Sequence, residues 1–188
     1  HAVKFAKRVT EGHLLELPQS AYDVITALSE QLLALHARVN RYGRRMTTVA
    51  KSEPRIALLQ TIPGIGPITA SAIVATVGSG EQFRSGRDLS AWLVLTPINK
   101  STGGKERLGR MTKAGQADIR RLLIIGAMSR LTWLGRRTIP AGSWLSRMLA
   151  RKPKMLVAIA LANKMARQIW AMLTKNENYR DPALAVVA

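Results

Sequence analysis

Apolar residues in the first quarter of the chain recur at alternating intervals of three and four, and this spacing constrains the fold more than any other feature. It places its members on one face of an α-helix, as in the seam of a coiled coil. Ser20 stands ahead of the pattern as an N-cap, so we expect one long amphipathic helix. Its apolar face needs a partner, either another helix of this chain or a second copy, and we favour an arm that mediates self-association. The seam residues are Ile25, Leu28, Leu32, Leu35, Val39, Tyr42 and Met46.

The charge of the chain indicates a polyanionic partner. The 188 residues include 29 Lys and Arg against 11 Asp and Glu, a net charge of +18, while 47% hydrophobic residues suffice for a packed core. Residues 100–167 alone hold 16 basic residues against Glu106 and Asp118. Solvated surfaces normally mix both signs. The segment therefore predicts an extended phosphate-binding surface with salt-sensitive affinity.

Composition also excludes several classes of protein. The chain has no cysteine and three histidines, so zinc fingers, disulfide scaffolds and thiol nucleophiles are excluded, and we expect a reducing cytoplasm. The longest apolar runs fall well short of the ~20 residues of a membrane helix. No signal peptide is evident. Because the chain begins with His1 and not with Met, we expect it to be part of a longer protein.

A glycine-containing turn between two short helices is the clearest local motif. The pattern predicts helices from Ser52 to residue 60 and over residues 68–77, joined by Pro-Gly-Ile-Gly, an arrangement that resembles a helix-hairpin-helix. Gly64 and Gly66 would let backbone amides approach a phosphate, next to the positive end of the second helix. The alternative is a tight turn with Ile65 filling the core.

The rest of the pattern is helical apart from one polar stretch. Ser85 is expected to cap a helix that ends near residue 95. Residues 98–110 are expected to form a loop or a short hairpin. Helices are expected again from about Thr112 and from Pro153. We therefore expect a mainly α fold, with a helical arm (1–50), a compact helical domain with a helix-hairpin-helix and a Gly-rich loop (51–175), and a tail (176–188).

The aromatic residues bear on the choice of substrate. Single-strand binding proteins stack bases on exposed aromatic side chains. We expect the tryptophans to be core residues, which favours duplex DNA. They are Trp92, Trp133, Trp144 and Trp170.

The chain offers a hydroxyl nucleophile in place of a metal centre. A two-metal phosphoryl-transfer site needs several converging carboxylates, and the basic half holds few. Ser101 lies in the Gly-rich stretch among Lys100, Lys105, Arg107 and Arg110, which could stabilise charge on a reacting phosphate. On spacing alone it is equally an ordinary turn residue. Besides Gly64, Ile65 and Gly66, the candidate nucleic-acid contacts are Thr102, Gly103, Gly104, Lys105, Arg107, Arg110, Lys113, Arg120 and Arg121.

Three ordered strings together resemble one family of insertion-sequence transposases. They are residues 59–67 (LQTIPGIGP), 83–93 (FRSGRDLSAWL) and 101–110 (STGGKERLGR). The match is to the C-terminal domain of the bacterial DEDD, or bridge-RNA-guided, transposases and extends over residues 51–173. That resemblance implies that Ser101, in Ser-x-Gly-Gly, is the catalytic nucleophile. Thr102, which also has a hydroxyl, is the second candidate for this role.

The resemblance also implies partners. In that family an N-terminal RuvC-like domain supplies four acidic residues and binds Mg²⁺, and this domain is absent here, so the chain alone is expected to be inactive. The implied partners are double-stranded DNA, a guide (bridge) RNA and further copies of the protein. Two other classes stay open: a non-catalytic helix-hairpin-helix DNA-binding module, and an RNA-binding protein of ribosomal character.

Overall fold

The computed structural model describes residues 1–13, 18–97, 114–136 and 139–181. Within these ranges the regular structure consists of eight α-helices, with no strand. The predicted mainly α fold is confirmed. The chain divides into two compact units, His1–Val49 and Ala50–Ala188. No helix in the described ranges is long and apolar enough to cross a membrane.

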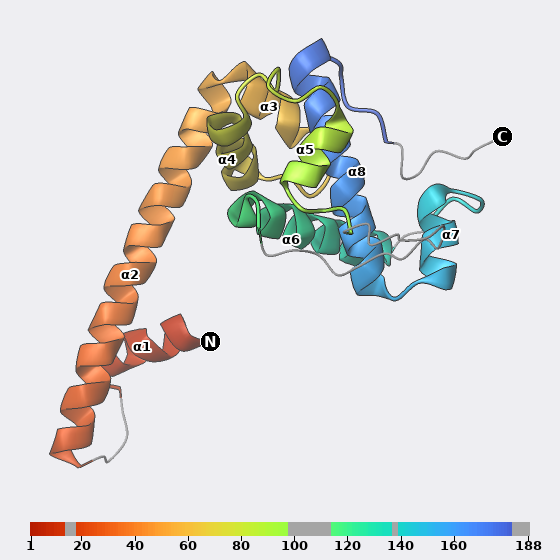
Figure 1. Cartoon of the computed structure of the whole chain (residues 1–188). Helices are drawn as coiled ribbons and strands as arrows, with labels where there is room; N and C mark the ends of the chain where they lie inside the picture. The colour runs from red at the N-terminus through yellow and green to blue at the C-terminus, as the bar shows by residue number, and fades with distance from the viewer. Residues whose placement is uncertain (14–17, 98–113, 137–138, 182–188) are drawn as a thin grey trace. The chain divides into compact units, whose positions relative to one another are not determined.

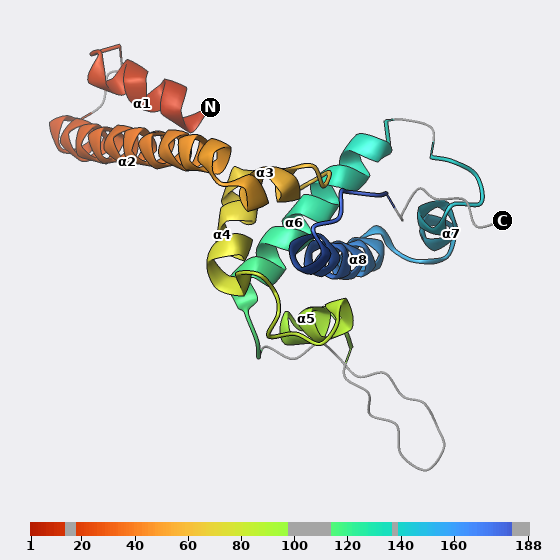
Figure 2. The same cartoon turned by 90° about the horizontal axis from the view of Figure 1, so that it is seen from above.

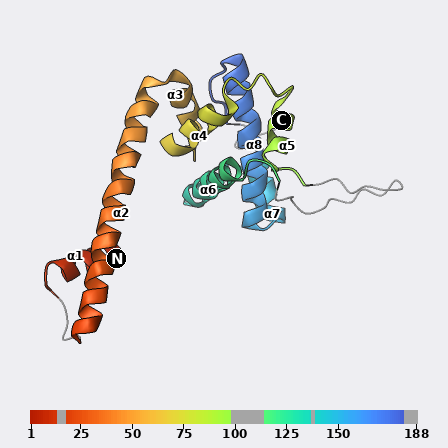
Figure 3. The same cartoon turned by 60° about the vertical axis from the view of Figure 1, so that its left-hand side comes forward.

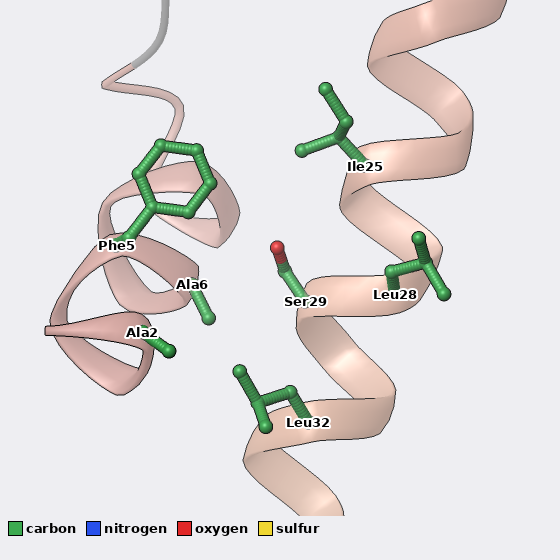
Figure 4. Close-up of a pocket in the computed structure, with 7 residues that line it drawn as sticks. All are labelled: Ala2, Phe5, Ala6, Ile25, Leu28, Ser29 and Leu32. Carbon is green, nitrogen blue, oxygen red and sulfur yellow. The ribbon is translucent and has the colours of Figure 1, made fainter.

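The first unit is a helical hairpin. α1 (Ala2–Thr10) lies beside the first part of α2 (Gln19–Ser52), and a shallow apolar groove runs between them (Figures 1 and 4). Figure 4 shows Phe5 and Ala6 of α1 facing Ile25 and Ser29 of α2. The groove is lined by Ala2, Phe5, Ala6, Ile25, Leu28, Ser29 and Leu32.

The predicted long helix is present as α2, but it starts earlier than expected. α2 already includes Gln19, and the carbonyl of Pro18 accepts the amides of Ala21 and Tyr22, so Ser20 lies inside the first turn. The prediction of Ser20 as an N-cap is wrong, because Pro18 begins the turn earlier in the chain.

The second unit is built around its last helix. α8 (Lys154–Lys175) packs against α3 (Pro54–Gln60), α5 (Gly86–Trp92), α6 (Ala117–Leu134) and α7 (Trp144–Arg151) (Figures 2 and 3). α4 (Pro67–Val77) packs against α3 and α6. The face that α8 buries repeats at helical spacing, which accounts for its central place. Its large members are Val157, Leu161, Met165, Ile169 and Met172.

Caps fix the short helices of this unit. Ser85 and Ser143 accept amide hydrogen bonds at the starts of α5 and α7, and the cap at Ser85 is the one that the sequence predicts. At α3 the cap is Glu53 and not Ser52, since Ser52 still belongs to α2 and Pro54 occupies the first helical position. α5 ends at Trp92, three residues before the predicted end, because Val94 takes a left-handed backbone conformation (φ 55°).

The described residues after α8 fold back on the unit. The carboxylate of Asp181 accepts from Nη2 of the buried Arg130, with both N···O distances 2.6 Å. The side chain of Gln168 donates to the carbonyl of Arg180. The sequence pattern suggested fraying beyond Lys175, but residues 176–181 are held instead, because a buried guanidinium requires an anionic partner.

Two tryptophans depart from the expectation of a core position. Trp92 is 37% exposed and Trp133 is 52% exposed. Trp170 is partly buried and donates to the carbonyls of Gly80 and Phe83. The prediction is therefore wrong for the first two, whose helices α5 and α6 present those positions to the surface.

Candidate functional site

The predicted nucleophile and most of its neighbours lie outside the described residues. Segment 98–113 contains Ser101, Thr102, Gly103, Gly104, Lys105, Arg107, Arg110 and Lys113. The structure does describe the residues on either side of this segment, and these define where it begins and ends.

The guanidinium of Arg120 joins the two flanks. Its Nη1 donates to the carbonyl of Leu93 at 3.3 Å and to the carbonyl of Ala114 at 3.0 Å. Leu93 precedes segment 98–113 and Ala114 follows it directly. Arg120 was a candidate phosphate contact, yet this nitrogen is used to hold the two flanks together.

Glycine at position 115 allows the flanks to touch. Gly115 has φ +76°, and a Cβ there would lie 2.3 Å from the carbonyl oxygen of Trp92 and 2.7 Å from Cγ2 of Val94. A larger residue would separate the two backbones. We call Trp92, Leu93, Val94, Leu95, Ala114, Gly115, Arg120 and Asn163 the base cluster.

α8 completes the base cluster. The side-chain amide of Asn163 donates to the carbonyl of Leu95 at 3.3 Å. The hydroxyl of Ser90, fully buried in α5, donates to the carbonyl of Gly86 at 2.9 Å and lies 3.4 Å from the carbonyl of Asn163. α8 thereby holds Leu95, three residues before segment 98–113.

The two glycines of the α3–α4 turn have different surroundings. Gly64 has φ +94°, and a Cβ there would lie 2.4 Å from the carbonyl oxygen of Gly126 in α6. Ile65 is 5% exposed and belongs to the core. Gly66 caps α4 with φ −91°, and a Cβ at this position would meet no atom within 4 Å. Both glycines are exposed, but packing requires glycine only at position 64, since a Cβ at Gly66 would meet no neighbouring atom.

Further cations surround these elements. Arg121 is exposed on α6, and α7 and α8 add Arg147, Arg151 and Arg167 to the surface. Lys164 is partly buried, and its pKa is lowered by burial and then by Arg167. These residues belong to the predicted basic segment, but those on α7 and α8 were not singled out from the sequence, because their grouping depends on how the two helices pack.

The acids of the described ranges form no metal centre. No three of their His, Asp and Glu side chains come together as a set of ligands. Asp88 lies in the first turn of α5 and Asp118 in the first turn of α6, where a negative charge stabilises the helix.

Comparison with known proteins identifies the central segment. Residues 56–139 match the family described as Transposase IS116/IS110/IS902 family. This segment is a transposase domain of that family. The domain begins within α3 and includes α4, α5, α6 and segment 98–113, so the α3–α4 turn and most of the base cluster fall inside it.

Curated relatives extend the similarity beyond the domain. The chain is 41% identical to a probable family 20 transposase of Pseudomonas aeruginosa over 87% of its own length and 48% of that protein's. It is 37% identical to the transposase for insertion sequence element IS1111A of Coxiella burnetii, over 84% of the chain and 43% of that protein. A pilin gene-inverting protein of Moraxella bovis is 28% identical over 66% of the chain and 38% of its own length. The chain spans about half the length, or less, of these relatives.

Proposed function

We propose that this chain is the DNA-binding and strand-exchange part of an insertion-sequence transposase, with Ser101 as its nucleophile. The observation that carries the proposal is the transposase domain over residues 56–139, which encloses the Ser-x-Gly-Gly motif. The base cluster supports it, because it brings together the two flanks of the segment that contains Ser101.

The proposed step exchanges one phosphate ester for another. The Ser101 oxygen attacks a backbone phosphorus, the bond from phosphorus to one deoxyribose oxygen breaks, and the serine proton ends on that leaving oxygen. The protein–DNA ester conserves the bond, so the reverse attack by another strand end needs no external energy source. The extra charge of the transition state would be stabilised by cations that follow Ser101 closely in the sequence, namely Lys105, Arg107 and Arg110.

The chain would work with parts that it does not contain. A RuvC-like domain elsewhere in the full protein would supply acidic residues and Mg²⁺, and the chain alone would then bind DNA without exchanging strands. A guide RNA and further copies of the protein complete the proposed assembly, which acts on DNA in the bacterial cytoplasm. The net charge of +18 supports binding to both nucleic acids.

The α3–α4 turn is the second proposed DNA contact. Gly66 is exposed at the start of α4, where no side chain caps the helix. Pro67 has no N–H, so the amides offered to a phosphate oxygen are those that follow it in the first turn. This observation also favours the alternative function, a helix-hairpin-helix module that binds DNA without catalysis.

Ser101→Ala in the full-length transposase separates the two functions. We expect recombination and the covalent protein–DNA adduct to be abolished while duplex affinity is kept, since a hydroxyl adds little to binding. Thr102→Ala is the matched control and should retain the adduct. Undiminished recombination by Ser101→Ala would contradict the serine assignment, and absence of any adduct in the parent protein would favour the non-catalytic module.

A further inference from the structure

A lysine of α8 lies over a tryptophan of α7, and each of the two has an arginine near it in the sequence. The Nζ atom of Lys164 lies over the ring of Trp144, 4.3 Å from its centroid. An arginine stands three residues after each partner of this contact, Arg147 after Trp144 on α7 and Arg167 after Lys164 on α8. Residues three apart share a helix face, so the contact between Trp144 and Lys164 brings both arginines to the same side.

The electrostatics of Lys164 agree with this geometry. Burial is the main cause that lowers the pKa of Lys164, and the charges of Arg167 and Arg147 lower it further. The acid that opposes them is Asp181, whose two oxygens already accept from Arg130. The charges of Arg147 and Arg167 thus both act on Lys164, and the carboxylate that opposes them is also engaged by Arg130.

The backbone beneath the cluster is held in place. A Cβ at Gly86 would lie 2.9 Å from both the Cα and the carbonyl oxygen of Arg167, so α5 and α8 meet there backbone to backbone. Trp144 in turn sits next to Ser143, whose fully buried side chain caps α7. Arg147 and Arg167 are exposed at the rim. Cations held close to one another repel, and a phosphate beside them would relieve that repulsion.

We propose that Arg147, Lys164 and Arg167 form a phosphate-binding site for the backbone of duplex DNA. Guanidinium groups suit this ligand because each can donate two parallel hydrogen bonds to phosphate oxygens. The site rests on the proposed function, since it supposes that the chain binds DNA. It adds a contact on α7 and α8, beyond the end of the family match at residue 139.

The salt dependence of DNA binding tests the site. The affinity of the chain for a fluorescent double-stranded oligonucleotide is measured over a salt series for the parent, for Arg147→Gln with Arg167→Gln, and for Lys164→Met. The slope of log affinity against log salt should fall by about 0.9 for each phosphate that a variant no longer neutralises. Far-UV circular dichroism and the unfolding midpoint show whether each variant folds. If Lys164→Met unfolds, the double variant Arg147→Gln with Arg167→Gln still tests the site, because both arginines are exposed.

Lys175→Met is the matched control. Lys175 also belongs to α8 and also lies over a tryptophan, with Nζ 6.0 Å from the Trp170 centroid, but Glu177 follows it closely in place of further cations. Its variant should keep the parent slope. If all three variants share the parent slope, the site is refuted while DNA binding stands. If the parent does not bind duplex DNA, both proposals fail. If the site variants selectively lose binding to a structured RNA, the assignment of the site to duplex DNA is refuted.

Discussion

At the residue scale, one short turn contains two glycines that are required for different reasons. Gly64 is in the left-handed region and abuts the backbone of Gly126, whereas Gly66 has an ordinary φ and open space around it. We expect Gly64→Ala to lower the free energy of unfolding by about 1–3 kcal/mol, because neither backbone can yield cheaply. Gly66→Ala should change it by less than about 1 kcal/mol. Urea unfolding of the two variants measures the difference.

The same pair tests the proposed DNA contact at the turn. Gly66→Ala should weaken duplex binding at constant stability, because a methyl group would hold a phosphate oxygen away from the amides of α4. Duplex affinity equal to that of the parent would leave the turn with a packing role only.

A buried phenol predicts how stability depends on pH. Burial raises the pKa of Tyr179 to about 12 from the ordinary value of 10.0, with Asp181 adding to the rise and Arg130 opposing it. Between pH 10 and 12 the unfolded chain loses this proton and the folded chain keeps it, so Tyr179 contributes stability that is lost as pH rises through that window. Tyr179→Phe should therefore unfold with a flatter pH dependence there. Parallel curves for variant and parent would contradict the pKa shift.

At the scale of elements, local sequence signals placed the helices well and missed what joins them. The cap at Ser85 and the end of α4 at residue 77 could be predicted because such signals act on their own helix. The early end of α5 could not be predicted in this way, since it depends on the contact of Gly115 with Trp92 and Val94. The roles of Arg120 and Asn163 likewise arise from carbonyls distant in sequence.

Arg120 has a packing role, joining the flanks of segment 98–113, that the sequence did not predict. On the proposed function, Arg120→Met in the full-length protein should reduce covalent adduct formation about 10- to 100-fold, because flanks that are no longer joined would misalign the nucleophile. Duplex affinity and its salt slope should stay at the parent values, since the guanidinium donates to Leu93 and Ala114. Arg121→Met, exposed on the next position, is the control. A slope lower by about 0.9 in Arg120→Met would restore Arg120 as a phosphate contact.

At the scale of the whole molecule, the two units differ in charge. The unit Ala50–Ala188 has 22 basic and 7 acidic residues, a net charge of +15, whereas His1–Val49 has a net charge of +3. Nucleic-acid binding is therefore expected to belong to the second unit. What the first unit offers is the seam of α2, where Leu28 is 60%, Leu35 49%, Val39 66% and Tyr42 50% exposed.

This exposed seam predicts self-association through α2. Apolar side chains at heptad spacing that α1 leaves uncovered are stabilised when a second helix buries them. We expect the chain to sediment as a dimer or larger assembly, and Leu35→Glu with Val39→Glu to sediment as a monomer with unchanged helix content. Ala37→Glu, exposed on the opposite face of α2, should keep the parent mass. A monomeric parent, or equal masses for the seam and control variants, would show that α2 does not mediate assembly.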